Sequence, residues 1–271
     1  MNKVIHYTPS RQTVRARMVR RVFWYFAVLG AGLAAIGAAY VVLYSDIFRV
    51  KQIRVEGNQR MSAETVMLLV QQYSEPALWQ HIIGPHNLLR WSEKKMSFSE
   101  TGLLTATIER NWRDRSINFI IEERDRFGIW CYGVSNSEPD AAKICYWFDT
   151  DGVLFESAPE TIGSLVLQID VSTSTPPIRG TSIVEPRFAP NVIIALRHLY
   201  DMAIPVRRVY FDPVQQELTV ISHDMPPLYL SIRFDPTVNL TSLKTLRSSL
   251  NLTEIEYLDL RVENKIFYKT R

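Results

Sequence analysis

The chain has 271 residues, of which 46% are hydrophobic and 22% charged, a composition that excludes disordered and collagen-like proteins. Its formal net charge of +3 is unevenly spread, because 6 of the 31 basic residues and none of the 28 acidic residues precede Asp46. The remaining 25 basic and 28 acidic residues sum to −3. Nucleic-acid binding needs a concentrated basic face on the folded part, so we expect no nucleic acid as a partner.

An uncharged segment, residues 22–44, follows the basic tail. As a helix it would exceed the roughly 30 Å of a bilayer's hydrocarbon core. Aromatic side chains, which favour the headgroup level, lie near both of its ends: Phe23, Trp24, Tyr25, Tyr40 and Tyr44. We therefore predict a transmembrane helix over residues 22–45. The alternative is a cleavable signal peptide, but the apolar region of such peptides has only about 7 to 15 residues.

The basic residues before this segment set the expected orientation of the chain in the membrane. Cytoplasmic flanks carry an excess of Lys and Arg, and only Arg49 and Lys51, mixed with Asp46, follow the segment closely. Residues 1–21 are therefore expected to be a cytoplasmic tail. The chain would be a single-pass type II protein of the cell membrane, with everything from residue 46 onward outside the cytoplasm.

The first exported segment, residues 46–124, shows the order strand, helix, helix, strand, strand. Val50, Ile53 and Val55 alternate with polar residues, which predicts a strand, and Gly57-Asn58 supplies the turn after it. Ser62 is a helix cap, and Pro76 limits the helix that follows. A short helix is expected over residues 92–98, and two strands that form a hairpin are expected around residues 104–108 and 117–121.

Two cysteines, Cys131 and Cys145, lie in the exported part, where oxidation can persist. They fall in two predicted strands, residues 128–132 and 144–148, which flank a long polar loop. Cysteines on the two strands of such a hairpin can face each other, so a disulfide is expected. Two buried free thiols remain the alternative, and a two-cysteine metal site is a weaker one.

The rest of the chain, residues 125–271, reads as a mostly β domain with two helices. Amphipathic spacing predicts the helices over residues 188–202 and 240–250. Strands are expected over residues 153–156, 165–169, 207–211, 217–221, 228–234 and 257–269. The predicted fold class is therefore α+β.

Several segments of the sequence together resemble a known family. Residues 48–58 read FRVKQIRVEGN, residues 87–89 read NLL, residues 106–112 read ATIERNW and residues 117–124 read INFIIEER. This series resembles a POTRA domain, specifically that of the FtsQ/DivIB family of bacterial cell-division proteins. Farther on, residues 148–155 read FDTDGVLF and residues 257–269 read YLDLRVENKIFYK, which is similar to the β domain of that family.

The resemblance implies a non-enzymatic scaffold at the division septum. The partners it implies are FtsL-like and FtsB/DivIC-like single-span division proteins. The last predicted strand could accept a partner strand if it lies at a sheet edge, and otherwise it merely completes the core. The candidate partner-binding residues are Tyr257, Asp259, Arg261, Lys265, Phe267 and Tyr268.

Signals for enzymes and cofactors are weak. Ser92 and Lys95 have the spacing of the penicillin-binding serine motif, but the other motifs of those enzymes are missing and Ser92 fits a helix cap better. Asp149 and Asp151 resemble the start of a calcium loop, yet an aspartate-glycine hairpin turn at Gly152 is the better interpretation. We expect no metal, cofactor or small-molecule substrate. Two alternatives remain, a POTRA-bearing assembly or secretion factor and, less favoured, a membrane-anchored cell-wall enzyme.

Overall fold

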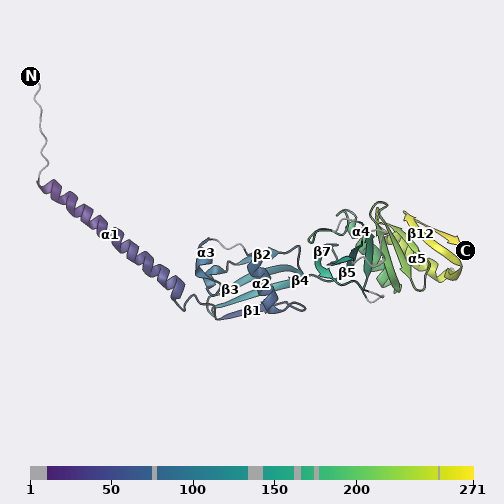
Figure 1. Cartoon of the computed structure of the whole chain (residues 1–271), viewed down its shortest axis with the longest axis horizontal. Coiled ribbons are helices and arrows are strands. Elements are labelled where there is room, and N and C mark those ends of the chain that lie inside the picture. The colour runs from purple at the N-terminus through teal and green to yellow at the C-terminus, as the bar shows by residue number, and fades with distance from the viewer. Residues whose placement is uncertain (1–10, 75–77, 134–142, 162–165, 174–176, 250) are drawn as a thin grey trace, which may run out of the picture. The chain divides into compact units, whose positions relative to one another are not determined.

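The computed structural model describes residues 11–74, 78–133, 143–161, 166–173, 177–249 and 251–271 (Figure 1). The fold is α+β with mostly β content, which confirms the predicted class. Two compact units make up the chain, the first from Met1–Glu56, Ala63–Lys94 and Thr107–Ile120, the second from Gly57–Ser62, Lys95–Ala106 and Ile121–Arg271. This division differs from the predicted boundary after Arg124. Lys3, Pro76, Leu165, Leu250 and residues 134–142 of the predicted loop lie outside the described residues.

A single long helix, α1 (Arg11–Tyr44), opens the described part of the chain. Within it Val19–Tyr44 is long and apolar enough to cross a membrane, and none of its most apolar stretch is buried inside the protein. The predicted N-terminal apolar helix is therefore present. It begins earlier than expected, since residues 11–21 of the predicted tail are also helical.

A four-stranded sheet follows α1, with the strand order β1-β4-β3-β2 (Figure 1). The elements are β1 (Gln52–Glu56), α2 (Ala63–Tyr73), α3 (Leu78–Ile83), the 3-10 turn η1 (Leu88–Arg90), β2 (Lys94–Ser97), β3 (Leu103–Asn111) and β4 (Ser116–Glu123). β1 and β4 are parallel, with Gln52 opposite Ser116. Val66, Val70 and Leu88 are fully buried, and Trp91 meets the ring of Phe119 edge-on at 5.2 Å.

The helix expected over residues 92–98 is wrong, because Lys94–Ser97 forms the edge strand β2 beside β3. The helical turn lies earlier, at η1, where the Asn87 side chain accepts a hydrogen bond from the Leu89 amide at 2.9 Å. Ser92 is consequently not a helix cap. Its Oγ accepts a hydrogen bond from Gln80 Nε2 at 3.1 Å.

The second unit is built on a nine-stranded sheet with the order β13-β12-β11-β10-β9-β8-β5-β6-β7. Its strands are β5 (Gly128–Gly133), β6 (Ile144–Phe148), β7 (Leu154–Ala158), β8 (Gln168–Ser172), β9 (Val206–Asp212), β10 (Glu217–Ser222), β11 (Leu228–Ser231), β12 (Ile255–Val262) and β13 (Lys265–Thr270). The helices are α4 (Ala189–Asp201), α5 (Thr237–Ser249) and the short η2 (Leu252–Glu254). Alternation and helical spacing thus place most of these elements within a few residues of their true bounds.

One face of this sheet makes the core with α4 and α5. The register aligns Val209, Val220, Leu228 and Leu258 across four strands, and these residues belong to the same buried cluster as residues of both helices. Successive side chains of a strand point to opposite faces. A second row therefore lies on the other face, and the register sets it out as Asp170, Tyr210, Thr219, Tyr229, Asp259 and Phe267.

Cys131 and Cys145 lie directly opposite each other on the antiparallel pair β5 and β6. Their side chains are joined in a disulfide, with 4.1 Å between the Cα atoms. Both residues are buried, in a small apolar cluster with Ile129. The bond closes a loop whose ends are 14 residues apart in sequence.

The turn between β6 and β7 contains a buried ion pair that sequence patterns do not reveal. Asp149 Oδ1 accepts hydrogen bonds from the amides of Asp151 and Val153, at 3.0 and 2.9 Å, and Gly152 has a φ of +75°. These are the features of the expected aspartate-glycine turn. The other carboxylate oxygen of Asp149 binds the guanidinium of Arg124, and the side chains are only 6% and 7% exposed. Arg124 also donates to the Phe98 carbonyl oxygen at 2.6 Å.

Candidate protein-binding edge at the C-terminal hairpin

The C-terminal strand predicted over residues 257–269 is in fact two strands, β12 and β13, joined by a tight turn. Val262 pairs with Lys265, so Glu263 and Asn264 make the turn. Asn264 has a φ of +59°, a left-handed conformation that Asn tolerates better than most residues. The prediction of one terminal strand is therefore wrong, and the candidate binding residues are divided between two strands.

β12 is paired on both sides. It runs parallel to β11, with Asp259 opposite Tyr229, and antiparallel to β13, with Asp259 opposite Phe267. A strand whose two sides are both occupied cannot accept a third through its main chain. Tyr257, Asp259 and Arg261 therefore do not lie on a sheet edge, contrary to the prediction of a terminal edge strand.

β13 is the edge strand of the nine-stranded sheet, and within the described parts of the chain β12 is its sole neighbour. All its residues are exposed except Ile266, which is partly buried against the core. Phe267 and Tyr268 are 51% and 50% exposed. Because neighbouring residues of a strand point to opposite faces, the two rings lie on opposite faces of the edge. Of the candidate residues, Lys265, Phe267 and Tyr268 thus lie on the exposed edge.

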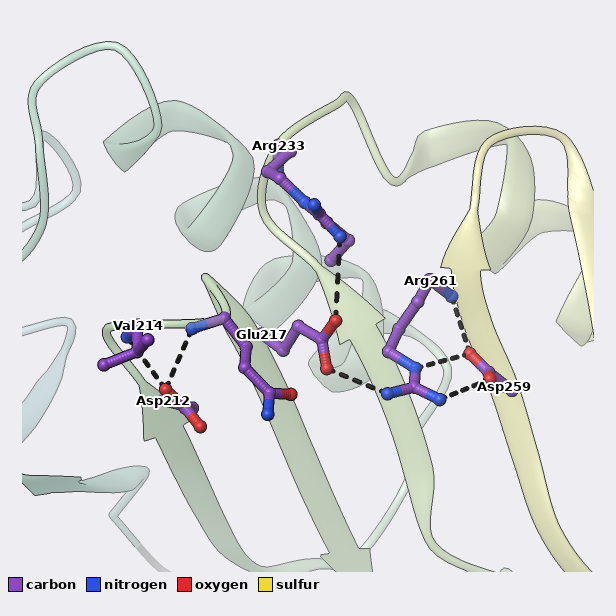
Figure 2. Close-up of polar contacts among 8 residues, drawn as sticks. Asp212, Val214, Glu217, Arg233, Asp259 and Arg261 are labelled. Atoms are coloured by element: carbon purple, nitrogen blue, oxygen red, sulfur yellow. Dashed lines mark hydrogen bonds and ion pairs between the residues drawn. The ribbon is translucent and has the colours of Figure 1, made fainter.

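An arginine between two carboxylates joins β12 to β10 (Figure 2). Arg261 bonds both oxygens of Asp259, with Nε to Oδ1 at 2.8 Å and Nη2 to Oδ2 at 2.6 Å. Its Nη1 reaches Glu217 at 3.0 Å, and the other oxygen of Glu217 lies 3.6 Å from Arg233 Nη2. The hydrogen bonds from Arg261 lower the pKa of Asp259, and those to Asp259 and then Glu217 raise the pKa of Arg261.

Aromatic rings pack against this ion-pair group. The guanidinium carbon of Arg261 lies 5.3 Å from the ring centre of Tyr229, within the range of a cation–π contact. Tyr229 in turn meets Tyr257 edge-on, with 5.6 Å between the ring centres. Asp259, Arg261 and Tyr257 are therefore already engaged within the sheet. The charges of Asp259 and Arg261 are paired with each other and with Glu217, so they are not free to pair with a partner.

Sequence reasoning missed Glu217, Arg233 and Tyr229, which complete the ion-pair group. Their separation from Arg261 ranges from 28 to 44 residues, and only the strand register brings them together. Among the described residues, no group of three or more His, Cys, Asp and Glu side chains is arranged to hold a metal ion. The arrangement at this hairpin is suited to recognition by shape, main-chain pairing and aromatic contact.

Comparison with known proteins does not assign a function to this edge. No protein-family model matches the sequence, and no characterised protein matches it significantly. The grounds for a function are therefore the short segments of sequence resemblance, the apolar helix α1 and the exposed edge strand β13.

Proposed function

We propose that the protein is a non-enzymatic, membrane-anchored scaffold of the bacterial division machinery. It links other single-span division proteins at the septum. In this proposal, residues 46–124 are a POTRA domain and residues 125–271 are a β domain of the FtsQ/DivIB type. The proposal is supported by the segments that resemble this family and by a helix, Val19–Tyr44, that is long and apolar enough to be the anchor.

The exposed edge β13 is the observation that carries the proposal. An extended segment of an FtsB/DivIC-like or FtsL-like partner would add to β13 as the next strand of the sheet. Main-chain hydrogen bonds to β13 would supply affinity, and Phe267 and Tyr268, each half exposed, would supply aromatic anchors on the two faces. The ion-pair group of Arg261 would hold β12 in place behind this edge.

Loss of either aromatic anchor is expected to weaken partner binding. Phe267→Ala and Tyr268→Ala each remove a ring of the kind that dominates interfaces, so the dissociation constant should rise by about 10-fold to 100-fold. The measurement is copurification of the FtsB/DivIC-like partner from membranes, followed by titration of the purified chains. Circular dichroism should be unchanged, because both rings are half exposed.

Tyr200→Ala is the matched control for these variants. Tyr200 lies on α4 and is 84% exposed, so the substitution removes an exposed aromatic ring from the same unit at a different surface. Partner binding should then match that of the unaltered protein. Full binding by a folded protein with both Phe267 and Tyr268 replaced would move the interface away from β13.

The proposed membrane topology makes a separate prediction. A reporter enzyme that is active only outside the cytoplasm should be active when it is fused after Arg271, because six basic residues precede the uncharged segment 22–44 and hold the N-terminus inside. The same reporter fused before residue 1 is the control and should be silent. The reverse pattern would overturn the topology and with it the proposed location of the partners.

A further inference from the structure

The turn between β3 and β4, residues 112–115, lies at the end of its sheet where the chain arrives from α1. β1 is the first strand after α1, and it begins at Gln52. β4 runs parallel to β1, with Ser116 opposite Gln52. Because parallel strands start at the same end of a sheet, the residues just before β4 lie beside the residues just before β1.

Two hydrogen bonds fasten this turn to the segment that leaves α1. The guanidinium of Arg115 donates to the carbonyl oxygen of Asp46 at 2.6 Å, and the Lys51 amide donates to the Arg115 carbonyl oxygen at 2.8 Å. Asp46 is two residues after Tyr44, the last residue of α1. Two residues of extended chain span at most about 7 Å. If α1 crosses a membrane, the turn is therefore held close to that membrane's surface.

The side chains at this turn suit a charged lipid surface. Trp112 is 48% exposed, and the guanidinium carbon of Arg110 lies 5.1 Å from its ring centre. Arg113 is exposed at the tip. The turn, the adjoining strand end and the exit segment bring together five cations and four acidic residues: Arg49, Lys51, Arg110, Arg113 and Arg115, with Asp46, Glu93, Glu109 and Asp114. Arg49 pairs with Asp46 and Arg110 with Glu93, so the cation exposed at the tip of the turn is Arg113. Exposed tryptophan together with an excess of arginine is typical of residues at the headgroup level.

We propose that the turn at residues 112–115 docks on anionic phospholipid headgroups of the membrane that holds α1. Trp112 would insert its exposed indole edge at headgroup depth, and Arg113 would pair with lipid phosphate. Arg115 is a positioning residue, since its bond to Asp46 fixes the turn beside the exit segment. The proposal rests on the anchoring role of α1 in the proposed function.

Amide hydrogen exchange of the full chain in lipid nanodiscs tests this docking. One set of discs contains zwitterionic phosphatidylcholine alone, and the other contains a third of anionic phosphatidylglycerol. Attraction of one arginine to an anionic surface corresponds to about a fivefold change in an equilibrium constant. Exchange of the amides of residues 112–115 is therefore expected to be at least about fivefold slower in the anionic discs. Trp112→Ser combined with Arg113→Glu should abolish the difference.

An arginine–aromatic pair in the second sheet supplies the matched control. Arg208 lies over Tyr210 at 5.9 Å on β9, so Tyr210→Ser combined with Arg208→Glu also replaces one aromatic ring and reverses one arginine charge, but in the other compact unit. This control should keep the lipid dependence at residues 112–115. Arg113→Gln alone removes the positive charge of Arg113 with the least effect on folding. This variant should lose most of the lipid dependence of exchange at residues 112–115.

The outcomes separate this inference from the proposed function. Equal exchange in the two kinds of disc, or lipid dependence that survives the Trp112 and Arg113 changes, overturns the docking while the anchoring stands. Protection of the turn that requires an added partner chain assigns it to protein binding and also overturns the docking. A full chain that does not enter nanodiscs at all refutes the anchoring of α1, and the docking with it.

Discussion

Asp149→Asn is expected to lower the free energy of unfolding by about 3 to 5 kcal/mol. The asparagine keeps a side-chain oxygen for the amides of Asp151 and Val153, so the turn after β6 retains its hydrogen bonds. What it removes is the charge that faces Arg124, and that guanidinium is left almost completely buried without a counter-ion. Urea unfolding of the detergent-solubilised full chain, followed by near-ultraviolet circular dichroism, measures the loss.

The exposed pair of Arg126 and Glu156 provides the comparison. It is another arginine–carboxylate contact in the same unit, at 2.7 Å, but its side chains are 38% and 45% exposed. Because solvent screens such a pair, Glu156→Gln should cost less than about 1 kcal/mol. Equal losses for Asp149→Asn and Glu156→Gln would show that burial of the Arg124 pair has no special effect on stability.

Replacement of both Cys131 and Cys145 by alanine is expected to lower the free energy of unfolding by about 3 kcal/mol. The disulfide closes a loop with a sequence separation of 14, and removing it increases the conformational entropy of the unfolded chain. Urea unfolding measures the change. Reduction of the disulfide in the unaltered protein, after denaturation has exposed it, should lower the free energy of unfolding by the same amount.

The state of the two cysteines can be measured directly as well. Intact mass should fall short of the fully reduced value by two hydrogens. Both cysteines are buried, Cys131 on β5 and Cys145 on β6, so alkylation should require reductant together with denaturant. Free alkylation of both thiols in the native protein would contradict the disulfide.

Local patterns predict those elements whose sequence periodicity matches their burial. The apolar residues that predict α4 (Val192, Ala195, Leu196 and Leu199) are all buried in the structure. In β10, Leu218 and Val220 are buried, and Thr219 between them lies on the other face. Each of these elements has one buried face, and the spacing of its apolar residues in the sequence shows which face that is.

Elements held by distant contacts were harder to predict. Lys94, Lys95 and Met96 favour a helix intrinsically, and they form β2 because β3 lies beside them. The terminal hairpin has no glycine in its turn, and Asn264 is its main local signal. At the candidate site, the sequence supplied Phe267 and Tyr268 correctly as residues of a β segment. Only the pairing of β12 with both neighbours shows which residues lie at the edge.

The parallel pairing of β11 with β12 also constrains the order in which this chain can assemble. Leu228 meets Leu258 across 30 residues that include α5, so β12 cannot join the sheet until α5 and everything before it have been synthesised. β13 pairs with β12, so it joins this sheet only once β12 is available to pair with it. A nascent or truncated chain without residues 255–271 would present β11 at that border of the sheet. Under the proposed docking mode, a partner that recognises β13 selects for chains in which β12 and β13 have already joined the nine-stranded sheet.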